Sequence, residues 1–174
     1  MAASEIVNPG KRISIARMTE HDLLEVVEIE ELSGISIWGW DAYHKELQSP
    51  EDVIMLVARL AGPTGPTGIV QIQPQGPAIA GFIISRLIAG ELHINNVAVR
   101  PEFRRQGIAA ELLTAVLGAG RSHGARLAFL EVRARNAAAQ GLYQSRGFQV
   151  AGRRKRYYNQ PVEDALLMSL LMET

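Results

Sequence analysis

The stretch NNVAVRPEFRRQGIAAELL, residues 95–113, joins an alternating apolar run, a short basic loop and the start of an amphipathic segment. The run ending at Val99 predicts a strand, and the residues from Ile108 onward predict a helix. Helix N-termini expose unpaired N–H groups and carry partial positive charge, so they favour anions. Gly107, immediately before the helix, lets the backbone approach a ligand closely. The stretch therefore predicts a strand–loop–helix unit that can hold a phosphate.

Two well-known phosphate-binding patterns do not match this loop. A P-loop needs two glycines, a lysine and a Ser/Thr at fixed spacing. The dinucleotide fingerprint needs three glycines, whereas this loop has Gly107 alone. On these residues alone, an ordinary strand–helix turn with surface arginines is an equally good interpretation.

Charge is balanced over the whole chain but unevenly distributed along it. The 174 residues carry 18 Lys/Arg and 18 Asp/Glu. Residues 1–99 have 6 Lys/Arg against 12 Asp/Glu, whereas residues 100–156 have 12 against 3. A basic segment favours an anionic ligand such as a phosphate-bearing co-substrate or nucleic acid, but a solvated basic face explains it equally well.

The composition excludes several kinds of functional site. Hydrophobic residues make up 47% and charged residues 21%, which is typical of a globular protein, and the length suits one domain, 1–174. The absence of cysteine excludes disulfides, thiolate zinc sites and a cysteine nucleophile. The four histidines lack ligand spacing, so no metal is expected.

Targeting segments are not expected. No stretch approaches the roughly 18 apolar residues of a membrane span. Residues 1–10 are expected to be a short leader, because they lack the apolar centre of a secretory signal. A cytoplasmic location and no membrane partner are therefore expected.

Outward from residues 95–113, the periodicity predicts an α/β layered domain with one mixed sheet. Gly and Pro are too dense in residues 61–77 for a core element, so this segment is expected to be a flexible connection. A tight turn at Ala89–Gly90 is expected to join two antiparallel strands. Strands are expected at 12–17, 53–60, 78–88, 90–100, 126–132, 148–158 and 163–172, and helices at 20–32, 40–49, 107–124 and 136–147.

A second stretch, LAFLEVRARNAAAQGLYQSRGF at residues 127–148, places Glu131 inside an apolar strand. Asn136 is a good N-cap for the helix that carries Tyr143. Glu131 suits a general base, but pairing with Arg133 or Arg135 explains it equally well. Tyr143 suits a general acid, but a tyrosine buried for packing is the commoner explanation.

Together these motifs resemble the GNAT N-acetyltransferase superfamily. The segment Arg104-x-x-Gly107-x-Ala109 resembles the family's Q/R-x-x-G-x-G/A signature, and NNVAVRPEFR resembles its preceding strand. The 127–148 stretch is similar to the RimI-type branch, which acetylates protein N-termini and whose best-known substrate is the N-terminal alanine of a small-subunit ribosomal protein. RRKRYYNQPVEDALLMSL and WGWDAYHKEL also resemble that branch, so the resemblance runs from about Ile13 to Leu170.

The resemblance implies a fold and a site. The fold would be a single mixed, mostly antiparallel sheet of six to seven strands flanked by about four helices. Glu131 would be the base and Tyr143 the acid, while Trp38 and Tyr158 would wall the acceptor groove. Acetyl-CoA, the co-substrate, would be held by Val97, Ala98, Val99, Arg104, Arg105, Gln106, Gly107, Ile108, Ala109, Ala110 and Asn136.

The implied activity is direct transfer of an acetyl group to the N-terminal amine of a protein, with a ribosomal protein as partner. A monomer is expected, and direct contact with nucleic acid is not required, although Arg153–Arg156 form a basic run. Acetylation of a small-molecule amine and a non-catalytic CoA-binding module stay open as alternatives. Two departures from the family pattern, the long 61–77 connection and Ile37 in place of a proline, leave the acceptor open.

Overall fold

The computed structural model describes residues 6–7, 13–60 and 79–172, and the expected order of helices and strands is confirmed. The connection expected at 61–77 lies outside the described residues. The strands are β1 (Ile6–Val7), β2 (Ile13–Arg17), β3 (Val53–Leu60), β4 (Ile79–Ile88), β5 (Glu91–Val99), β6 (Leu127–Arg133), β7 (Gln149–Asn159) and β8 (Val162–Leu171). The helices are α1 (Leu23–Ser33), α2 (Gly39–Leu47), α3 (Ile108–Ser122) and α4 (Ala137–Ser145), with 3-10 turns η1 (Glu20–Asp22) and η2 (Pro101–Phe103).

The strands follow the hydrogen-bonded order β1-β2-β3-β4-β5-β6-β8-β7 in one sheet. β5 and β6 pair in parallel, whereas β1–β2, β2–β3, β6–β8 and β7–β8 pair antiparallel, which confirms the mixed, mostly antiparallel sheet. The short β1 lies inside the stretch expected to be a leader, and it adds a strand to the expected six to seven.

The chain divides into two compact units. The first contains the chain up to Ile84 together with Asn96–Val116, and the second contains Ser85–Asn95 and the chain from Leu117 onward.

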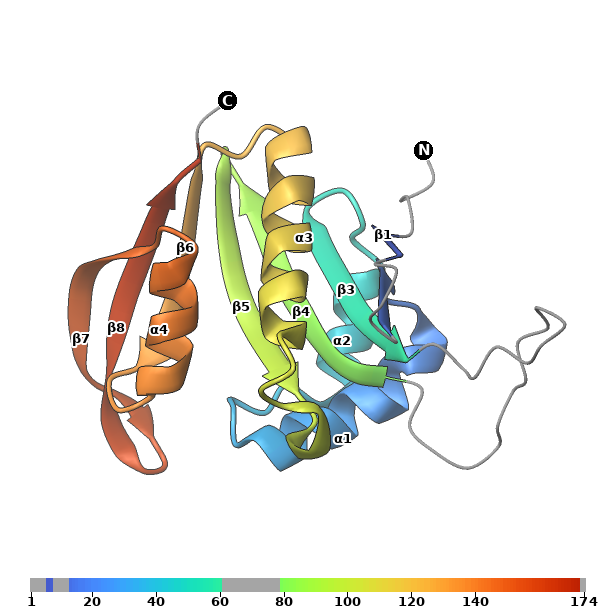
Figure 1. Ribbon diagram of the computed structural model, residues 1–174, viewed down its shortest axis with the longest axis horizontal. Coiled ribbons are helices and arrows are strands. Elements are labelled where there is room, and N and C mark those ends of the chain that lie inside the picture. Colours follow the sequence, from blue (N-terminus) through green and yellow to red (C-terminus); the bar gives the residue numbers. More distant parts are fainter. Residues whose placement is uncertain (1–5, 8–12, 61–78, 173–174) are drawn as a thin grey trace, which may run out of the picture. The chain divides into compact units, whose positions relative to one another are not determined.

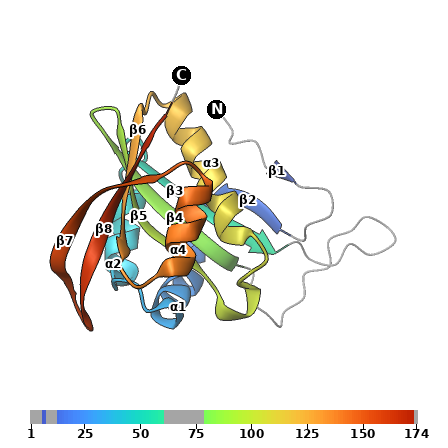
Figure 2. The ribbon, with the colours of Figure 1, turned by 60° about the vertical axis from the view of Figure 1, so that its left-hand side comes forward.

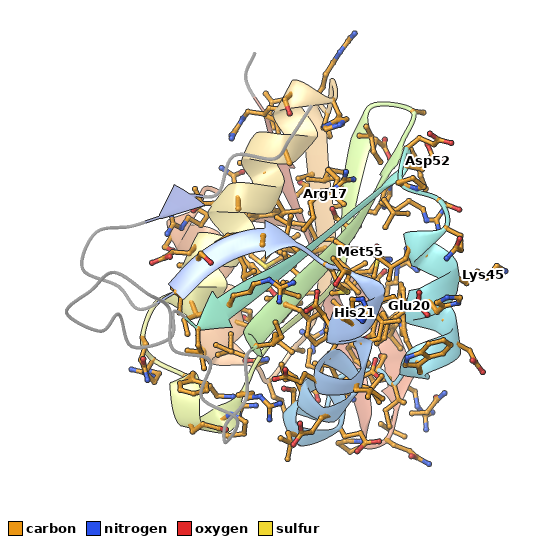
Figure 3. The ribbon with its side chains drawn as sticks, turned by 90° about the vertical axis from the view of Figure 1, so that its right-hand side faces the viewer. Arg17, Glu20, His21, Lys45, Asp52 and Met55 are labelled. Carbon is orange, nitrogen blue, oxygen red and sulfur yellow. The ribbon has the colours of Figure 1, made fainter. Side chains whose placement is uncertain are left out.

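In the first unit, α1 and α2 cover one face of β3 and the start of α3 lies on the other (Figure 1). Figure 3 shows these layers from the side, with Met55 on β3 and Lys45 on α2 labelled. The helices bring apolar side chains onto the strands at helical spacing, for example Leu23, Val26 and Ile29 of α1, all fully buried. The core also includes Tyr43, Val53, Met55, Val57, Ile79, Phe82 and Ile84.

In the second unit, α4 lies against one face of β6 and β8 (Figure 2). β6 alternates between buried and half-buried positions, with Ala128, Leu130 and Val132 on its buried face. The expected turn is confirmed, because Ala89 and Gly90 both have positive φ, 51° and 83°. Gly124 after α3 and Gly147 after α4 also have the positive φ expected of helix C-caps, 86° and 91°.

Candidate active site

The loop before α3 has the backbone of an anion cradle. Arg105 and Gly107 both have positive φ, 63° and 81°, so the chain turns sharply before the helix begins at Ile108. The first N–H groups of α3 have no acceptor within the helix. Arg105, Gln106 and Gly107 are exposed, while Ala109 and Ala110 are half-buried. The loop can therefore bind a phosphate with backbone N–H groups and the helix dipole.

Arg104 supports this loop from within. Its Nε donates to the carbonyl oxygen of Val99 at 3.0 Å, and its Nη2 donates to the Ser33 hydroxyl at 3.3 Å. The guanidinium thus ties the end of β5 to the end of α1. Arg104, which was predicted to hold the co-substrate, thus also holds the shape of the loop.

The residues at the end of β5 are firmly held. A Cβ atom added to Gly81 of β4 would lie only 2.6 Å from the carbonyl oxygen of Ala98, so the backbones approach as only glycine permits. The Arg100 N–H donates to the carbonyl oxygen of Ala80 at 2.8 Å. Ala98 and Val99 are buried and Val97 is half-buried, so this segment is a rigid wall of the first unit.

Trp38 is held by a buried carboxylate that sequence reasoning missed. Glu30 of α1 accepts hydrogen bonds from the N–H groups of Trp38 at 2.7 Å and Gly39 at 3.0 Å, which are donors at the start of α2. It also accepts a hydrogen bond from the Tyr43 hydroxyl. Trp38 stacks on Tyr43 with ring centroids 5.6 Å apart. Glu30 therefore caps α2 and positions Trp38.

Asn96 continues this network to β5. Its side-chain amide donates to the Tyr43 hydroxyl at 3.0 Å. Burial, followed by the hydrogen bond to Glu30, raises the pKa of Tyr43 far above its usual value, so the phenol stays neutral. The buried chain Glu30–Tyr43–Asn96 ends one residue before Val97.

Glu131 of β6 makes an ion pair that sequence reasoning did not foresee. The expected alternatives were Arg133 and Arg135, but Arg154 of β7 is the partner, with its Nε 3.0 Å from Glu131 Oε1. The Tyr157 hydroxyl also hydrogen-bonds Glu131, and this raises the pKa of Tyr157. The carboxylate side chain is 23% exposed, so it lies at the edge of solvent.

Arg133 contacts residues of the β7–β8 hairpin and does not pair with Glu131. Its guanidinium donates to Glu163 at 3.3 Å and to the carbonyl oxygen of Gln160 at 3.1 Å. The same guanidinium lies 4.2 Å from the centre of the Tyr158 ring. Arg135 also meets Glu163, through its backbone N–H at 2.7 Å. Arg133 and Glu163 therefore fix Tyr158 at the end of β7.

A β-bulge in β7 directs side chains toward Glu131. Arg154 pairs with Ala165, but the next paired residue is Tyr158, opposite Glu163, so β7 contains extra residues at this point. Asp164 holds the bulge by accepting from the Arg156 N–H at 2.8 Å and from Arg153 Nε at 2.7 Å. Bulges commonly re-aim side chains beside functional sites.

Asn136 and Tyr143 lie on α4. Asn136 accepts a hydrogen bond from the Ala139 N–H at 3.0 Å, which confirms the expected N-cap. Tyr143 is 8% exposed and packs edge-on against Phe148, with ring centroids 6.0 Å apart. Burial, with a smaller contribution from nearby Tyr158, raises the pKa of Tyr143 to about 12.

Glu131 and Tyr143 approach from opposite faces of the sheet. Glu131 shares the face of Arg133, which is two residues along β6. A Cβ atom on Gly147, just after α4, would lie 3.2 Å from the side chain of Leu170, which pairs with Ala128 on the other face. Tyr158 interacts electrostatically with both Glu131 and Tyr143.

The pairing of β6 changes at the position of Glu131. β6 pairs with β5 from Glu91–Leu127 to Ile94–Leu130. Its pairing with β8 goes on to Arg133–Ala165. Glu131 is therefore the first residue of β6 after its pairing with β5.

The second unit therefore holds the predicted residues Glu131, Tyr143 and Tyr158, with Tyr158 in electrostatic contact with the other two. The predicted residues Trp38, Val97–Val99 and 104–110 belong to the first unit, and Asn136 to the second. Among the residues that the structure describes, no cluster of three or more His, Asp or Glu could hold a metal ion. No helix within 13–60 or 79–172 is long and apolar enough to cross a membrane.

Sequence reasoning missed Glu30, Asn96, Glu163 and Asp164, and it did not foresee that Arg154 and Tyr157 contact Glu131. The pattern RRKRYYN before a turn was a clue to Arg154 and Tyr157, since basic and aromatic side chains concentrate there. The others have no local signature, because their partners lie on other elements.

Comparison with known proteins places this geometry in a family. The family model described as "Acetyltransferase (GNAT) family" matches residues 28–148. The N-alpha-acetyltransferase RimI of Mycobacterium tuberculosis is 31% identical over 160 residues, covering 90% of each chain. The [ribosomal protein bS18]-alanine N-acetyltransferase of Escherichia coli K12 is 39% identical over 98 residues, covering 55% of this chain and 66% of the relative.

A solved structure agrees with these relatives. The crystal structure of the ribosomal-protein-S18-alanine N-acetyltransferase from Escherichia coli matches with a TM-score of 0.75 and 27% identity, covering 93% of this chain and 95% of that one. The family match includes the strand–loop–helix cradle, and the solved structure shares the fold of this chain. The chain belongs to the GNAT family of acetyltransferases.

Proposed function

We propose that this protein transfers the acetyl group of acetyl-CoA to the α-amino group of a protein N-terminus, with the N-terminal alanine of ribosomal protein bS18 as its substrate. A relative named for acetylation of bS18-alanine supports the acceptor, and a relative named as an N-alpha-acetyltransferase aligns over 90% of both chains. The observation that carries the chemistry is the Glu131 cluster, in which a half-buried carboxylate meets Arg154 and Tyr157 at the end of β6.

Glu131 is the proposed base. An N-terminal amine has a pKa of about 7.7–8.0, so most of it is protonated at neutral pH and cannot attack a thioester. Glu131, with 23% of its side chain exposed, is accessible to the incoming ammonium or to one bridging water. It takes one proton from the ammonium, and the freed lone pair attacks the thioester carbonyl carbon to form the new C–N bond. As the C–S bond breaks and the amide forms, the nitrogen loses a second proton to solvent, from which the Tyr143 phenol regains the proton that it gives to sulfur.

Tyr143 is the proposed acid. As the C–S bond breaks, the leaving sulfur gains negative charge, and the Tyr143 hydroxyl donates its hydrogen to that sulfur. A pKa of about 12 keeps the phenol protonated at every working pH, so its O–H donor is always present. An asparagine side chain is neutral but has no acidic proton, and arginine and lysine side chains carry a positive charge. Tyrosine combines a neutral side chain with a proton that it can transfer.

The first unit supplies the proposed cradle for acetyl-CoA, which provides the acetyl group. The pyrophosphate is assigned to the backbone N–H groups of 105–110, supported by the positive φ of Arg105 and Gly107. The thioester arm is assigned to the backbone of Val97–Val99. Asn136, whose side-chain oxygen caps α4, is assigned a further contact to the co-substrate through its remaining polar groups.

The test is an acetylation assay with acetyl-CoA and a panel of peptides that differ in their first residues. An alanine-first peptide is expected to be acetylated on its α-amine, and Glu131→Gln is expected to lower kcat by about 10²–10⁴-fold. Glu91→Gln, which removes a half-buried carboxylate on β5, is the matched control and is expected to keep normal turnover.

Three results would contradict the proposal. Acetylation of lysine side chains alone would reject the N-terminal acceptor. Turnover of small amines in preference to every peptide would favour a small-molecule acetyltransferase. Full activity in Glu131→Gln would reject Glu131 as the base.

A further inference from the structure

Arg154 occupies the carboxylate that the proposed reaction needs. Its Nε lies 3.0 Å from Glu131 Oε1, and this arginine side chain is 57% exposed whereas Glu131 is 23% exposed. One end of the ion pair is therefore anchored in the sheet, and the other lies on the surface, where it can move away.

The hairpin presents the guanidinium in a defined place. Arg154 immediately precedes the bulge that Asp164 holds through Arg153 and Arg156. The Arg154 guanidinium also lies 5.5 Å from the centre of the Tyr157 ring, within the range of a cation–π contact. The Tyr157 hydroxyl bonds the same carboxylate. Arg154 therefore contacts the Tyr157 ring while it pairs with Glu131.

The acceptor of the proposed reaction is also a cation until it gives up its proton. An α-ammonium group and a guanidinium are both N–H donors of charge +1, and both bind carboxylates. The ammonium and the Arg154 guanidinium therefore compete for Glu131, because Arg154 already binds the Oε1 atom that the ammonium would bind.

Resting on the proposed function, we propose that Arg154 is a positioning residue that fills the ammonium position on Glu131 and is displaced only by a cationic acceptor amine. Exchange of one cation for another keeps the carboxylate paired at every stage. The displaced guanidinium stays over Tyr157, and the ammonium then passes its proton to Glu131. A blocked N-terminus carries no charge and takes no part in the exchange, so Arg154 opposes binding of the free amine and leaves binding of the acetylated product unchanged.

The test compares Arg154→Met, Arg154→Lys and the control Lys155→Met, which removes an equal charge from the same exposed hairpin. The KM for an alanine-first peptide and the inhibition constant of its acetylated product are measured for each. The peptide must break the Arg154–Glu131 ion pair to bind, and an exposed ion pair of this kind is weak. Arg154→Met is therefore expected to lower the peptide KM by only about two- to fivefold. Its product inhibition constant and the KM for acetyl-CoA are expected to stay unchanged.

Arg154→Lys keeps a competing cation and is expected to retain the wild-type peptide KM, and Lys155→Met is expected to do the same. Urea unfolding midpoints check that the variants are folded. The inference is overturned if Arg154→Met raises the peptide KM, changes peptide and product affinity in parallel, or matches Lys155→Met. If the wild type acetylates no N-terminal peptide at all, the proposed function fails and this inference fails with it. Normal acetylation with an unchanged KM rejects the Arg154 exchange alone.

Discussion

The hydroxyl group of Tyr43 donates a hydrogen bond to the carboxylate of Glu30, and both side chains are completely buried. The pair joins α1 to α2 across 13 positions of sequence. It also determines where Trp38 lies, because the same carboxylate receives the N–H groups of Trp38 and Gly39. A carboxylate in this place is a structural anchor for the predicted acceptor wall.

Replacing Glu30 with alanine is expected to destabilise the protein strongly. The change leaves the Tyr43 hydroxyl and two backbone N–H groups without their acceptor, and each buried donor left unpaired costs about 1–3 kcal/mol. The free energy of unfolding, measured with urea, is expected to fall by about 3 kcal/mol or more. The neighbouring Glu31 is exposed, so Glu31→Ala is the control and should change stability by less than about 0.5 kcal/mol. Similar stability for the two variants would show that the network contributes little.

The backbone at Gly107 gives a second prediction. A residue with a Cβ atom pays about 1–2 kcal/mol to hold a φ of 81°, so Gly107→Ala is expected to distort the cradle or destabilise it by that amount. Affinity for CoA, measured by calorimetry, is expected to fall. Gly118 is the matched control, since it lies within α3 with open space around it. Gly118→Ala is expected to stabilise the helix by up to about 1 kcal/mol without weakening CoA binding. Unchanged CoA affinity in Gly107→Ala would reject the cradle.

Much of the fold could be predicted from local patterns. The strand at 53–60, the helix beginning after Gly107 and the Asn136 cap all depend on residues close in sequence, and each is confirmed. Periodicity and capping act over a few residues, so they can be recognised without knowing the tertiary structure.

The partners of buried and half-buried charges could not be predicted this way. Glu30 lies in the acidic run EVVEIEEL, which resembles a solvated helix face, and only the start of α2 explains its burial. If Glu131 was paired, its expected partner was Arg133 or Arg135, two or four residues away. In the structure it pairs across the sheet with Arg154, while Arg133 pairs with Glu163. The bulge in β7 decides this choice, and its sequence carries no glycine or proline to announce it.

The raised pKa of Tyr143 gives a pH prediction. Burial, then the neighbouring Tyr158, raises this pKa from 10.0 to about 12, so the neutral phenol is favoured in the folded protein. The wild-type rate is therefore expected to show no loss between pH 9 and 10 from ionisation of Tyr143. Tyr143→Phe is expected to lower kcat by about 10²–10⁴-fold with little change in the KM for acetyl-CoA.

Tyrosinate absorbance provides the direct check. The difference spectrum between wild type and Tyr143→Phe is expected to show ionisation of one phenol near pH 12, above the range of an exposed tyrosine. The corresponding stability is fully present below pH 10 and is lost as pH rises through 12, because the folded state holds the proton more tightly. Ionisation of this phenol near pH 10 would show that Tyr143 is open to solvent.

The last prediction concerns Asp164, which holds the bulge that aims Arg154 and Tyr157. The Arg156 N–H and then the Arg153 guanidinium lower the pKa of Asp164 below its usual value. The charged carboxylate therefore stabilises the folded hairpin at neutral pH. That stabilisation is present above the unfolded pKa of about 3.9 and is lost as pH falls through the lower folded value.

Asp164→Asn keeps the shape of the side chain but removes its charge. The variant is expected to be less stable than wild type at pH 7, and the difference should disappear as the pH falls below the folded pKa of Asp164. Because the bulge loosens, the peptide kcat/KM is expected to fall while the KM for acetyl-CoA is unchanged. Glu111→Gln, on α3, serves as a charge-matched control and is expected to leave the peptide kcat/KM as it is. A stability difference that is the same at pH 3 and pH 7 would show that the charge of Asp164 does not hold the bulge.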